Sequence, residues 1–273
     1  MFIDTHCHLD TIVCFGSESA TLNPEKFKII AQLIDEAKNA GVLTIFNVGC
    51  DVLTSHNSIE IAKKFTEVFA IIGLHPYEGK SGWQEEFYTI KKMVINRNPL
   101  DKIIGIGEIG LDYSRENSNR HAQQELFKNQ LNLALEQNLP ISFHVRDAAD
   151  DFLKIIEPYS KELRGVVHCF QQDQAFARQV TSWGLLLGID GPITYPKNTY
   201  LREITQAIDL KYLVLETDAP FLPVQKERGK INYPSKIPLI GQALAVLKNL
   251  SVEEIAAATT DNATSLFLTK NYR

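Results

Sequence analysis

Two histidines at the end of the first apolar run of the chain have the type and spacing of metal ligands. The run Phe2–Thr5 leads into His6, and His8 follows after one further residue. Side chains alternate between the two faces of a β-strand, so both histidines are expected to point the same way. Two imidazoles side by side at a strand end provide the first two ligands that a divalent ion needs. A His-x-His pair also occurs as an ordinary surface pair, so this interpretation needs further ligands.

Further candidates stand at or just after other apolar runs of the chain. They are His75, Glu108, His144, His168 and Asp218. Taken singly, each has an ordinary alternative as a loop carboxylate, a satisfied core histidine or a turn residue. Five of the seven histidines nevertheless stand at such run ends. The other two, His56 and His121, are assigned to solvated or capping positions.

The segments between these residues alternate between two patterns. Eight short runs have strand character: Phe2–Thr5, Leu43–Val48, Phe69–Gly73, Ile103–Gly107, Ile141–His144, Gly165–His168, Leu185–Ile189 and Tyr212–Glu216. They are apolar throughout, which is typical of parallel strands buried on both faces. Helical spacing lies between them. One helix face comprises Phe27, Ile30, Ala31, Ile34 and Ala37, with Gly41 as a stop, and another comprises Phe127, Leu131, Ala134 and Leu135.

This alternation predicts an α/β fold, a single (β/α)8 TIM barrel that occupies residues 1–273 as one domain. No linker rich in proline, glycine or serine divides the chain. A doubly wound open sheet is the alternative, because the sequence does not show whether the sheet closes. In a barrel the active site lies at the C-terminal ends of the strands, where the candidate ligands would converge. Segment 251–267, with Ser251 as N-cap and Glu254 in the first turn, predicts a closing helix.

Composition narrows the function classes. A formal net charge of −5 argues against a broad basic surface that coats nucleic acid, but it leaves room for a local, metal-based phosphate site. No apolar run reaches the roughly 18 residues of a membrane span, and the N-terminus lacks the features of a signal peptide. We therefore expect a cytoplasmic protein without a membrane partner or an obligate protein partner. The four cysteines lack C-x-x-C spacing and are expected to be reduced, with Cys7 and Cys169 in the core.

The segment Gly105–Gly110 has the G-x-G-x-x-G spacing of a dinucleotide site. No good helix begins at its third glycine, and residues 112–115 read as loop. We therefore expect these glycines to let the backbone turn tightly beneath a ligand instead.

Six nitrogen and oxygen ligands are more than one catalytic zinc with an open position takes, since such an ion usually has about three protein ligands. They suit two ions if one carboxylate bridges, and Glu108 is the natural bridge because it comes from the middle of the barrel order. Two ions about 3.5–4 Å apart can hold a hydroxide between them and neutralise charge on an attacked phosphate. The remaining ligands are, for one ion, His6, His8 and Asp218 and, for the other, His144 and His168.

Several segments together resemble the TatD-type metal-dependent deoxyribonucleases, within the broader amidohydrolase-like barrels. The matching segments run nearly end to end: FIDTHCHLD at 2–10, GLHP at 73–76, GEIGLDY at 107–113, HVRDA at 144–148, HCF at 168–170, ETDAP at 216–220 and RGK at 228–230, with Asn232 and Pro234. The resemblance implies the two-ion ligand set, with Mg2+ or a similar divalent ion such as Mn2+ or Zn2+. It also implies DNA as the substrate and hydrolysis of its phosphodiester bonds.

Two departures from the family pattern stand in expected rim loops. Gln171 and Gln172 replace a small residue and a glycine after the HCF segment, and Tyr233 replaces an acidic residue. Both departures bear on substrate preference more than on metal binding.

The resemblance implies that Asp218 ligates one ion and accepts a proton from the attacking water. His75 is expected to contact a phosphate oxygen or the leaving group, or else to be a loop histidine beside Pro76. Asp4 shares the face of His6 and is expected to orient the ligands, with a buried structural carboxylate as the alternative.

Other side chains are candidates for substrate contact. Arg146 could form a fork to phosphate, or pair with a neighbouring aspartate. The cations Lys226, Arg228 and Lys230 could guide a strand, although such runs are often only solvated. The negative net charge favours single strands or strand ends, which stack on aromatic residues. The aromatic candidates, each of which packing also explains, are Trp83, Tyr113 and Tyr195.

Three functions remain open. The first is a two-metal nuclease. The second is a barrel hydrolase that acts on an amide, ester or lactone; many of those bridge their ions with a modified lysine at the strand-four position, where this chain has Glu108. The third is a metal-binding scaffold with little turnover, which predicts a broken ligand set, whereas all six candidate ligands are present.

Overall fold

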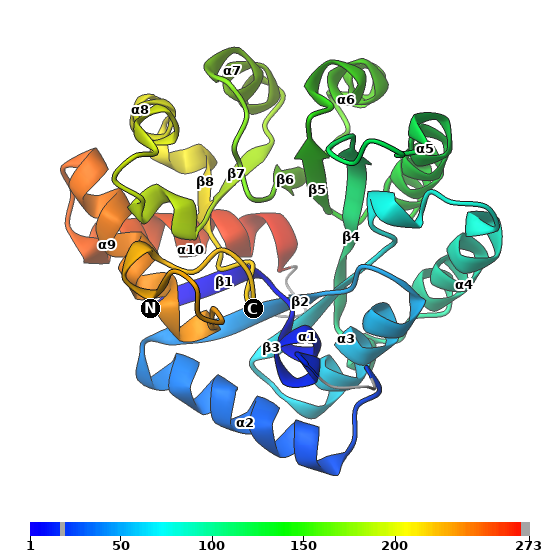
Figure 1. Ribbon diagram of the computed structural model, residues 1–273, viewed down its shortest axis with the longest axis horizontal. Helices are drawn as coiled ribbons and strands as arrows, with labels where there is room; N and C mark the ends of the chain where they lie inside the picture. Colours follow the sequence, from blue (N-terminus) through cyan, green and yellow to red (C-terminus); the bar gives the residue numbers. More distant parts are fainter. Residues whose placement is uncertain (17–19, 269–273) are drawn as a thin grey trace.

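The computed structural model describes residues 1–16 and 20–268 of the chain. Its strands form one parallel sheet in which each strand pairs with the next along the chain (Figure 1). The strands are β1 (Phe2–Cys7), β2 (Val42–Val48), β3 (Val68–Ile72), β4 (Ile103–Asp112), β5 (Ile141–Arg146), β6 (Gly165–Val167), β7 (Leu186–Ile189) and β8 (Leu213–Leu215). The eight predicted strands are thus confirmed, with shifted ends.

The sheet closes on itself where the first and last strands meet. Cys7 forms a parallel bridge with Ala219. The backbone N–H of His8 donates to Ala219 O at 2.8 Å, and the N–H of Asp218 donates to His6 O at 2.9 Å. The prediction of a TIM barrel is therefore confirmed, and the open-sheet alternative is wrong.

Helices surround the barrel and cover the outer face of its strands (Figure 1). They are α1 (Leu9–Cys14), α2 (Pro24–Asn39), α3 (Val52–Lys64), α4 (Trp83–Ile95), α5 (Arg120–Glu136), α6 (Ala149–Ile156), α7 (Gln174–Ser182), α8 (Thr199–Ala207), α9 (Ile237–Lys248) and α10 (Val252–Phe267). The two predicted helix faces lie on α2 and α5. Beyond α2, Gly41 has a φ of +91°, a left-handed conformation that suits a helix stop. None of the described helices is long and apolar enough to cross a membrane.

Strand β4 corrects two expectations. It continues to Asp112, so Glu108 lies within the strand rather than after it. The glycines of the G-x-G-x-x-G segment are therefore strand residues and make no turn beneath a ligand. A Cβ on Gly107 would lie 2.7 Å from Ser142 Cβ on the neighbouring strand. Close approach of β4 and β5 explains this glycine.

Two apolar clusters fill the structure. The larger one lies between the strands and the surrounding helices. The smaller one gathers residues of most strands inside the barrel, where Phe46 contacts Phe267 of α10 with ring centroids 5.1 Å apart. Cys7 is fully buried in the larger cluster, as predicted. The same prediction for Cys169 is wrong, because this residue is only half-buried at the rim, with a φ of +46°.

The predicted cap of the closing helix α10 is confirmed. The backbone N–H of Glu254 donates to Ser251 Oγ at 3.2 Å, and the N–H of Ser251 donates to Glu254 Oε2 at 2.8 Å. These two bonds satisfy N–H groups that a helix start leaves without partners. Because α10 carries Phe267 into the barrel interior, its stability contributes to that of the whole barrel.

Replacing Ser251 with alanine is expected to lower the free energy of unfolding by about 1 kcal/mol, the usual effect of losing such a cap. Urea denaturation followed by circular dichroism measures the change. Ser251→Asp, which retains a capping oxygen, is the control and is expected to stay close to wild type. An unchanged midpoint for Ser251→Ala would show that the cap does not contribute.

Candidate metal centre

The six predicted ligands converge at one end of the barrel, although they come from distant parts of the chain. His6 lies in β1 and His8 follows that strand, while Glu108 lies in β4. The other three lie in β5 or directly after β6 and β8, and they are His144, His168 and Asp218. All six come from the C-terminal parts of parallel strands, which meet at the same rim of a barrel. Their arrangement into two groups follows from their distances.

The first group consists of His6, His8 and Asp218, whose ligand atoms lie within 4.8 Å of one another. The Nε2 atoms of the two histidines are 3.2 Å apart. Asp218 Oδ1 lies 3.4 Å from His8 Nε2 and 3.8 Å from His6 Nε2. Two imidazole nitrogens and one carboxylate oxygen thus face a common point.

The second group consists of Glu108, His144 and His168. Glu108 Oε1 lies 2.5 Å from His144 Nδ1 and 2.7 Å from His168 Nε2. The two ring nitrogens are 3.2 Å apart. This group has the same donor chemistry as the first.

Glu108 lies between the two groups. Its Oε1 faces His144 and His168, as given above. Its Oε2 lies 3.5 Å from His6 Nε2 and 4.0 Å from His8 Nε2. The carboxylate therefore presents one oxygen to each group, which is the arrangement that a bridging ligand requires.

Hydrogen bonds on the far side of two rings set which nitrogen faces the centre. His8 Nδ1 lies 2.7 Å from the carbonyl oxygen of Val48 and must donate to it. His144 Nε2 lies 3.0 Å from Asp112 Oδ2 and must donate to that carboxylate. In the neutral rings the opposite nitrogens therefore carry lone pairs that point into the centre. Metal-bound histidines characteristically donate their other N–H in this way, so these residues fit a pair of cations.

Burial and neighbouring charges set the ionisation of the first group and of the bridge. Burial would raise the pKa of Glu108, but His168 and its neighbours outweigh it and hold that pKa well below its usual range. Burial also opposes ionisation of Asp218, yet the hydrogen bond with His8 leaves its pKa lowered. The pKa of His6 falls to about 4, mainly because the ring is buried. At neutral pH the two carboxylates are charged and His6 is neutral, which are the forms that bind cations.

His8 differs from His6, because the neighbouring Cys50 and Asp218 outweigh burial and raise the pKa of its ring well above the usual value. His144 differs from His6 in the same direction. Burial alone would lower its pKa, but the charge of Glu108 and the hydrogen bond to Asp112 raise it to about 9. The proton between His144 Nδ1 and Glu108 occupies the place of a cation. Binding of a metal ion at this group therefore releases a proton.

His75 lies beside the second group. It begins the turn η1 (Pro76–Glu78), and its Nδ1 accepts the N–H of Tyr77 at 3.1 Å. Its Nε2 lies 3.7 Å from Glu108 Oε1. Burial lowers the pKa of the ring to about 3, so it is neutral at neutral pH. The backbone bond and the position beside Glu108 aim the Nε2 atom at the centre.

Sequence reasoning missed Asp112, Glu216 and Cys50, which the structure brings to the centre. Glu216 is fully buried, with Oε1 3.7 Å from His168 Nδ1. The first two carried a signal: Asp112 lies four residues after Glu108 on one strand, and Glu216 lies two before Asp218. The Cys50 Sγ atom is 3.5 Å from Glu108 Oε2, and no sequence spacing indicated it.

Asp112→Asn is expected to weaken metal binding by about 10- to 100-fold, since it removes the charged acceptor that holds the His144 ring. Isothermal titration with Mn2+ measures the affinity and the stoichiometry. Asp151→Asn, on the outer helix α6, is the control and is expected to bind Mn2+ as wild type does. Equal affinities for Asp112→Asn and wild type would show that Asp112 does not support the ligand.

Asp4 acts on the backbone beside the centre. It is fully buried, and its carboxylate accepts the N–H of Thr217 at 2.9 Å and the Thr217 hydroxyl at 2.6 Å. It also accepts the N–H of His6 at 3.3 Å. Asp4 thus fastens β1 to the segment that carries Asp218, without touching a ligand ring. His56 and His121 are exposed, away from the centre.

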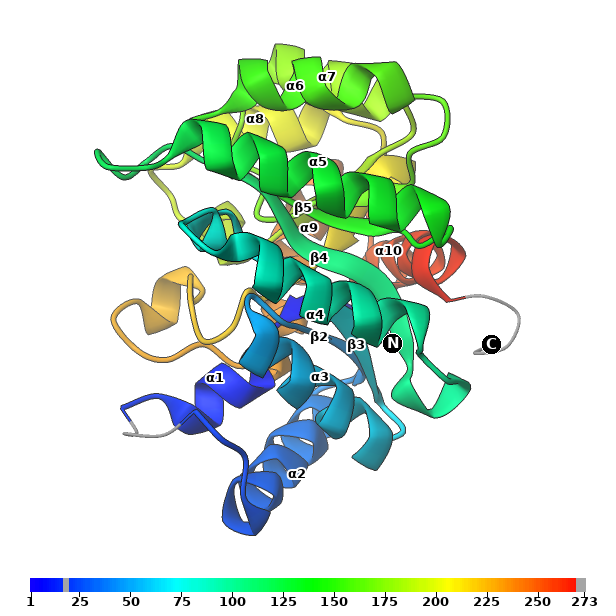
Figure 2. The same ribbon diagram turned by 90° about the vertical axis from the view of Figure 1, so that its right-hand side faces the viewer.

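The predicted substrate contacts Arg146, Arg228 and Lys230 all lie at the surface. Arg146 and Lys230 are exposed. Arg228 stacks on Tyr195, with its guanidinium carbon 4.8 Å from the ring centroid. Figure 2 shows the segment after β8, which carries Arg228 and Lys230, on the same side of the molecule as the loop before α5.

Two of the aromatic residues predicted as substrate contacts are largely buried. Trp83 and Tyr113 are both only 9% exposed and belong to the core, which favours the packing alternative for each. The structure explains one of the two residues that depart from the family pattern at 171–172. Gln172 Nε2 donates to Val145 O at 2.8 Å and fastens the loop after β6 to β5.

Comparisons with known proteins decide the family. The pattern described as TatD related DNase matches residues 3–268. The chain belongs to this family. A TatD homologue from Escherichia coli K12, YjjV, has a crystal structure that covers 98% of both chains with a TM-score of 0.88 and 28% identity.

Two sequence relatives of this TatD-family chain carry descriptions. The uncharacterized metal-dependent hydrolase YabD of Bacillus subtilis is 34% identical over 269 residues, which are 98% of this chain and 99% of that protein. The 3'-5' ssDNA/RNA exonuclease TatD of Erwinia amylovora is 32% identical over 243 residues, which are 86% of this chain and 92% of that protein. The chain is thus a metal-dependent hydrolase of the TatD family.

Proposed function

We propose that this protein hydrolyses phosphodiester bonds of single-stranded DNA, acting from strand ends, with two divalent cations that Glu108 bridges. The observation that carries the proposal is the position of Glu108, with one oxygen toward each of two groups of ligands. Two cations in such an arrangement would neutralise the charge of an attacked phosphate and activate water. The name of the Erwinia relative, an exonuclease of single-stranded DNA and RNA, supports a nucleic acid as the substrate.

The cations would be held by His6, His8 and Asp218 on one side and by His144 and His168 on the other. Four imidazole nitrogens and two carboxylates suit Mn2+ or Zn2+ better than Mg2+, which prefers oxygen ligands and retains several waters. We therefore propose Mn2+ or Zn2+ as the effective ion, although resemblance alone implies Mg2+.

Asp218 is the proposed proton acceptor. It is ionised, and its Oδ1 lies 3.4 Å from His8 Nε2 and 3.8 Å from His6 Nε2. Its backbone has a φ of +53°, a conformation that aspartate tolerates and that turns the side chain toward the barrel axis. In this position Asp218 takes the proton of the attacking water.

His75 is proposed to position the phosphate. The ring is neutral, and its Nδ1 accepts a backbone N–H, so its Nε2 carries the proton and is a donor. A phosphate oxygen above Glu108 would lie within reach of this N–H. Binding a phosphate oxygen in this way requires an N–H donor but no positive charge. The low pKa of His75 keeps the ring neutral at neutral pH.

The test is hydrolysis of single-stranded DNA labelled at its 5' or 3' end by metal-stripped protein, to which Mg2+, Mn2+ or Zn2+ is added. The expected result is a ladder of products that depends on the ion, with Mn2+ or Zn2+ more effective than Mg2+. The labelled end gives the direction of digestion. No cleavage with any ion, in protein shown to bind two ions, would contradict the proposal and direct the search to amide, ester and lactone substrates.

A further inference from the structure

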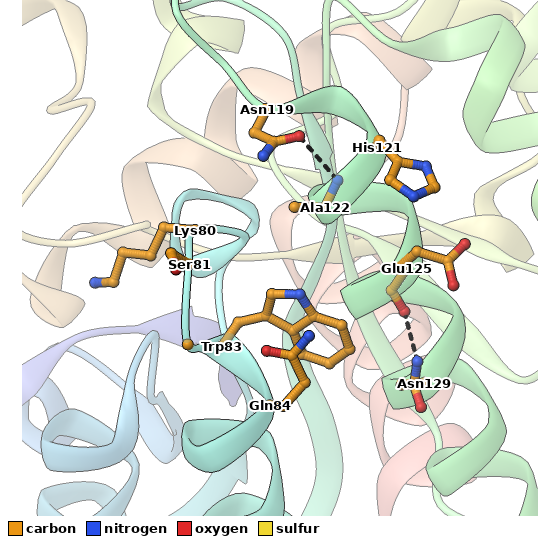
Figure 3. Close-up of a pocket in the computed structure, with 10 residues that line it drawn as sticks. Lys80, Ser81, Trp83, Gln84, Asn119, His121, Ala122, Glu125 and Asn129 are labelled. Carbon is orange, nitrogen blue, oxygen red and sulfur yellow. Dashed lines mark hydrogen bonds between the residues drawn. The ribbon is translucent and has the colours of Figure 1, made fainter.

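Two adjoining cavities lie beside the metal centre, between the turn after β3 and the loop before α5. Their volumes are about 570 and 420 Å3, within the range of ligand pockets. Lys80, Ser81 and Asn119 line both cavities, so the two form one trough. Figure 3 shows the larger cavity, with Trp83 and Lys80 on one side and α5 on the other.

Tyr77 connects the smaller cavity to His75, which lies beside the metal centre. Tyr77 lines the smaller cavity, and its ring centroid lies 4.6 Å from that of His75. His75 Nε2 in turn lies 3.7 Å from Glu108 Oε1. A polymeric substrate whose scissile bond lies beside Glu108 can therefore extend past His75 and Tyr77 into the trough.

A stacked cation stands at the entrance. The guanidinium carbon of Arg115 lies 3.5 Å from the centroid of the Tyr77 ring, and Arg115 also lines the smaller cavity. Within the described residues Arg115 forms no ion pair, and its side chain is exposed. A guanidinium stacked on a ring keeps its second face for a base and its N–H edge for a phosphate.

The remaining lining is polar and carries few uncompensated charges. Lys80 pairs with Glu78 at 2.5 Å, and the acidic Glu125 pairs with Lys128 at 3.0 Å. His121 also lines the larger cavity. The other polar lining residues carry amides or hydroxyls and include Ser81, Gln84, Asn117, Ser118, Asn119, Gln123 and Asn129. Such side chains form hydrogen bonds with bases and sugars without selecting one base by charge. An isolated cation, an aromatic ring and neutral polar walls are typical of a channel for single-stranded nucleic acid.

We propose that this trough holds the nucleotides on one side of the scissile phosphodiester, with Arg115 stacked between Tyr77 and a base or bound to a phosphate. The proposal rests on the proposed nuclease function. It places substrate contact in the segments after β3 and β4, whereas the cations singled out from the sequence, Arg146, Arg228 and Lys230, lie at the end of β5 and after β8.

The test measures binding of a fluorescein-labelled thymidine strand of about twelve nucleotides by fluorescence anisotropy, over a series of salt concentrations. Phosphorothioate linkages keep the charge of the strand and resist hydrolysis by the metal-loaded protein. Arg115→Ala is expected to weaken binding about tenfold and to reduce the salt dependence by about one phosphate contact, a slope change of about 0.7. Arg115→Lys is expected to retain the salt dependence but to lose affinity, because the ammonium does not stack as a plane.

The control is Arg178→Ala, since Arg178 is an exposed arginine on α7, a helix that does not line the trough. This variant is expected to bind as wild type does. In a parallel measurement, Arg115→Ala should lower the kcat/KM ratio of the long strand to a dinucleotide about tenfold. Equal affinity and equal salt dependence of Arg115→Ala and wild type would overturn the proposal that the trough holds nucleotides. Absence of cleavage by wild type would overturn the nuclease function instead, and the binding measurement would still decide the trough.

Discussion

Replacing Glu108 with glutamine is expected to lower kcat/KM for phosphodiester hydrolysis by about a thousandfold or more, because the amide removes the charge shared by both ligand groups. The side chain is 3% exposed and of the same shape as glutamine, so the fold should persist. Bound metal should fall from two ions to one or fewer per chain. Steady-state kinetics and metal analysis by mass spectrometry measure the two effects together.

The matched control for this change is Glu157→Gln, which removes the same charge at an exposed position outside the centre. It is expected to keep wild-type kinetics and two bound ions. Two tightly bound ions and wild-type turnover in Glu108→Gln would show that the carboxylate does not bridge.

Asp218→Asn is expected to lower kcat by about 100- to 10,000-fold, because the amide cannot accept the proton of the attacking water. The change also removes a ligand of the group that contains His6 and His8. Measurement of kcat across a range of Mn2+ concentrations separates the two effects. Loss of a ligand alone is corrected by excess metal, whereas loss of the base is not.

If Asp218 is the proton acceptor, kcat of Asp218→Asn is expected to stay low at saturating Mn2+, while the ligand group around His168 still binds one ion. Recovery of wild-type kcat at high metal would restrict Asp218 to a ligand role. His56→Gln, an exposed change on α3, serves as the control and is expected to leave kcat unaltered.

The barrel and the ligand groups could be predicted because their signals are local. Each strand contains a short, mostly apolar run, and each ligand lies at or near the end of such a run. His6 and His8 share a strand face. Glu108 comes from the middle of the order of strands, which places it between the two ligand groups. These relations follow from the geometry of parallel strands and need no side-chain coordinates.

The contacts behind the ligands could not be predicted because they depend on side-chain packing across the barrel. Glu216 reaches His168 only because the Cys169 backbone turns at a positive φ and donates to that carboxylate. Cys50 reaches Glu108 from the loop after β2, which no spacing in the sequence indicates. Trp83 and Tyr113 were predicted as platforms because residue type alone does not reveal burial. The trough depends similarly on how Arg115 folds back over Tyr77.

The most direct test of the account is a crystal structure of the Mn2+-loaded protein, with the ions located by anomalous scattering. A bridged centre should give two anomalous peaks about 3.5–4 Å apart, each in contact with a different oxygen of Glu108. One peak should lie against His6, His8 and Asp218, and the other against His144 and His168. A single ion, or two ions that do not share Glu108, would contradict the bridged centre on which the proposed hydrolysis depends.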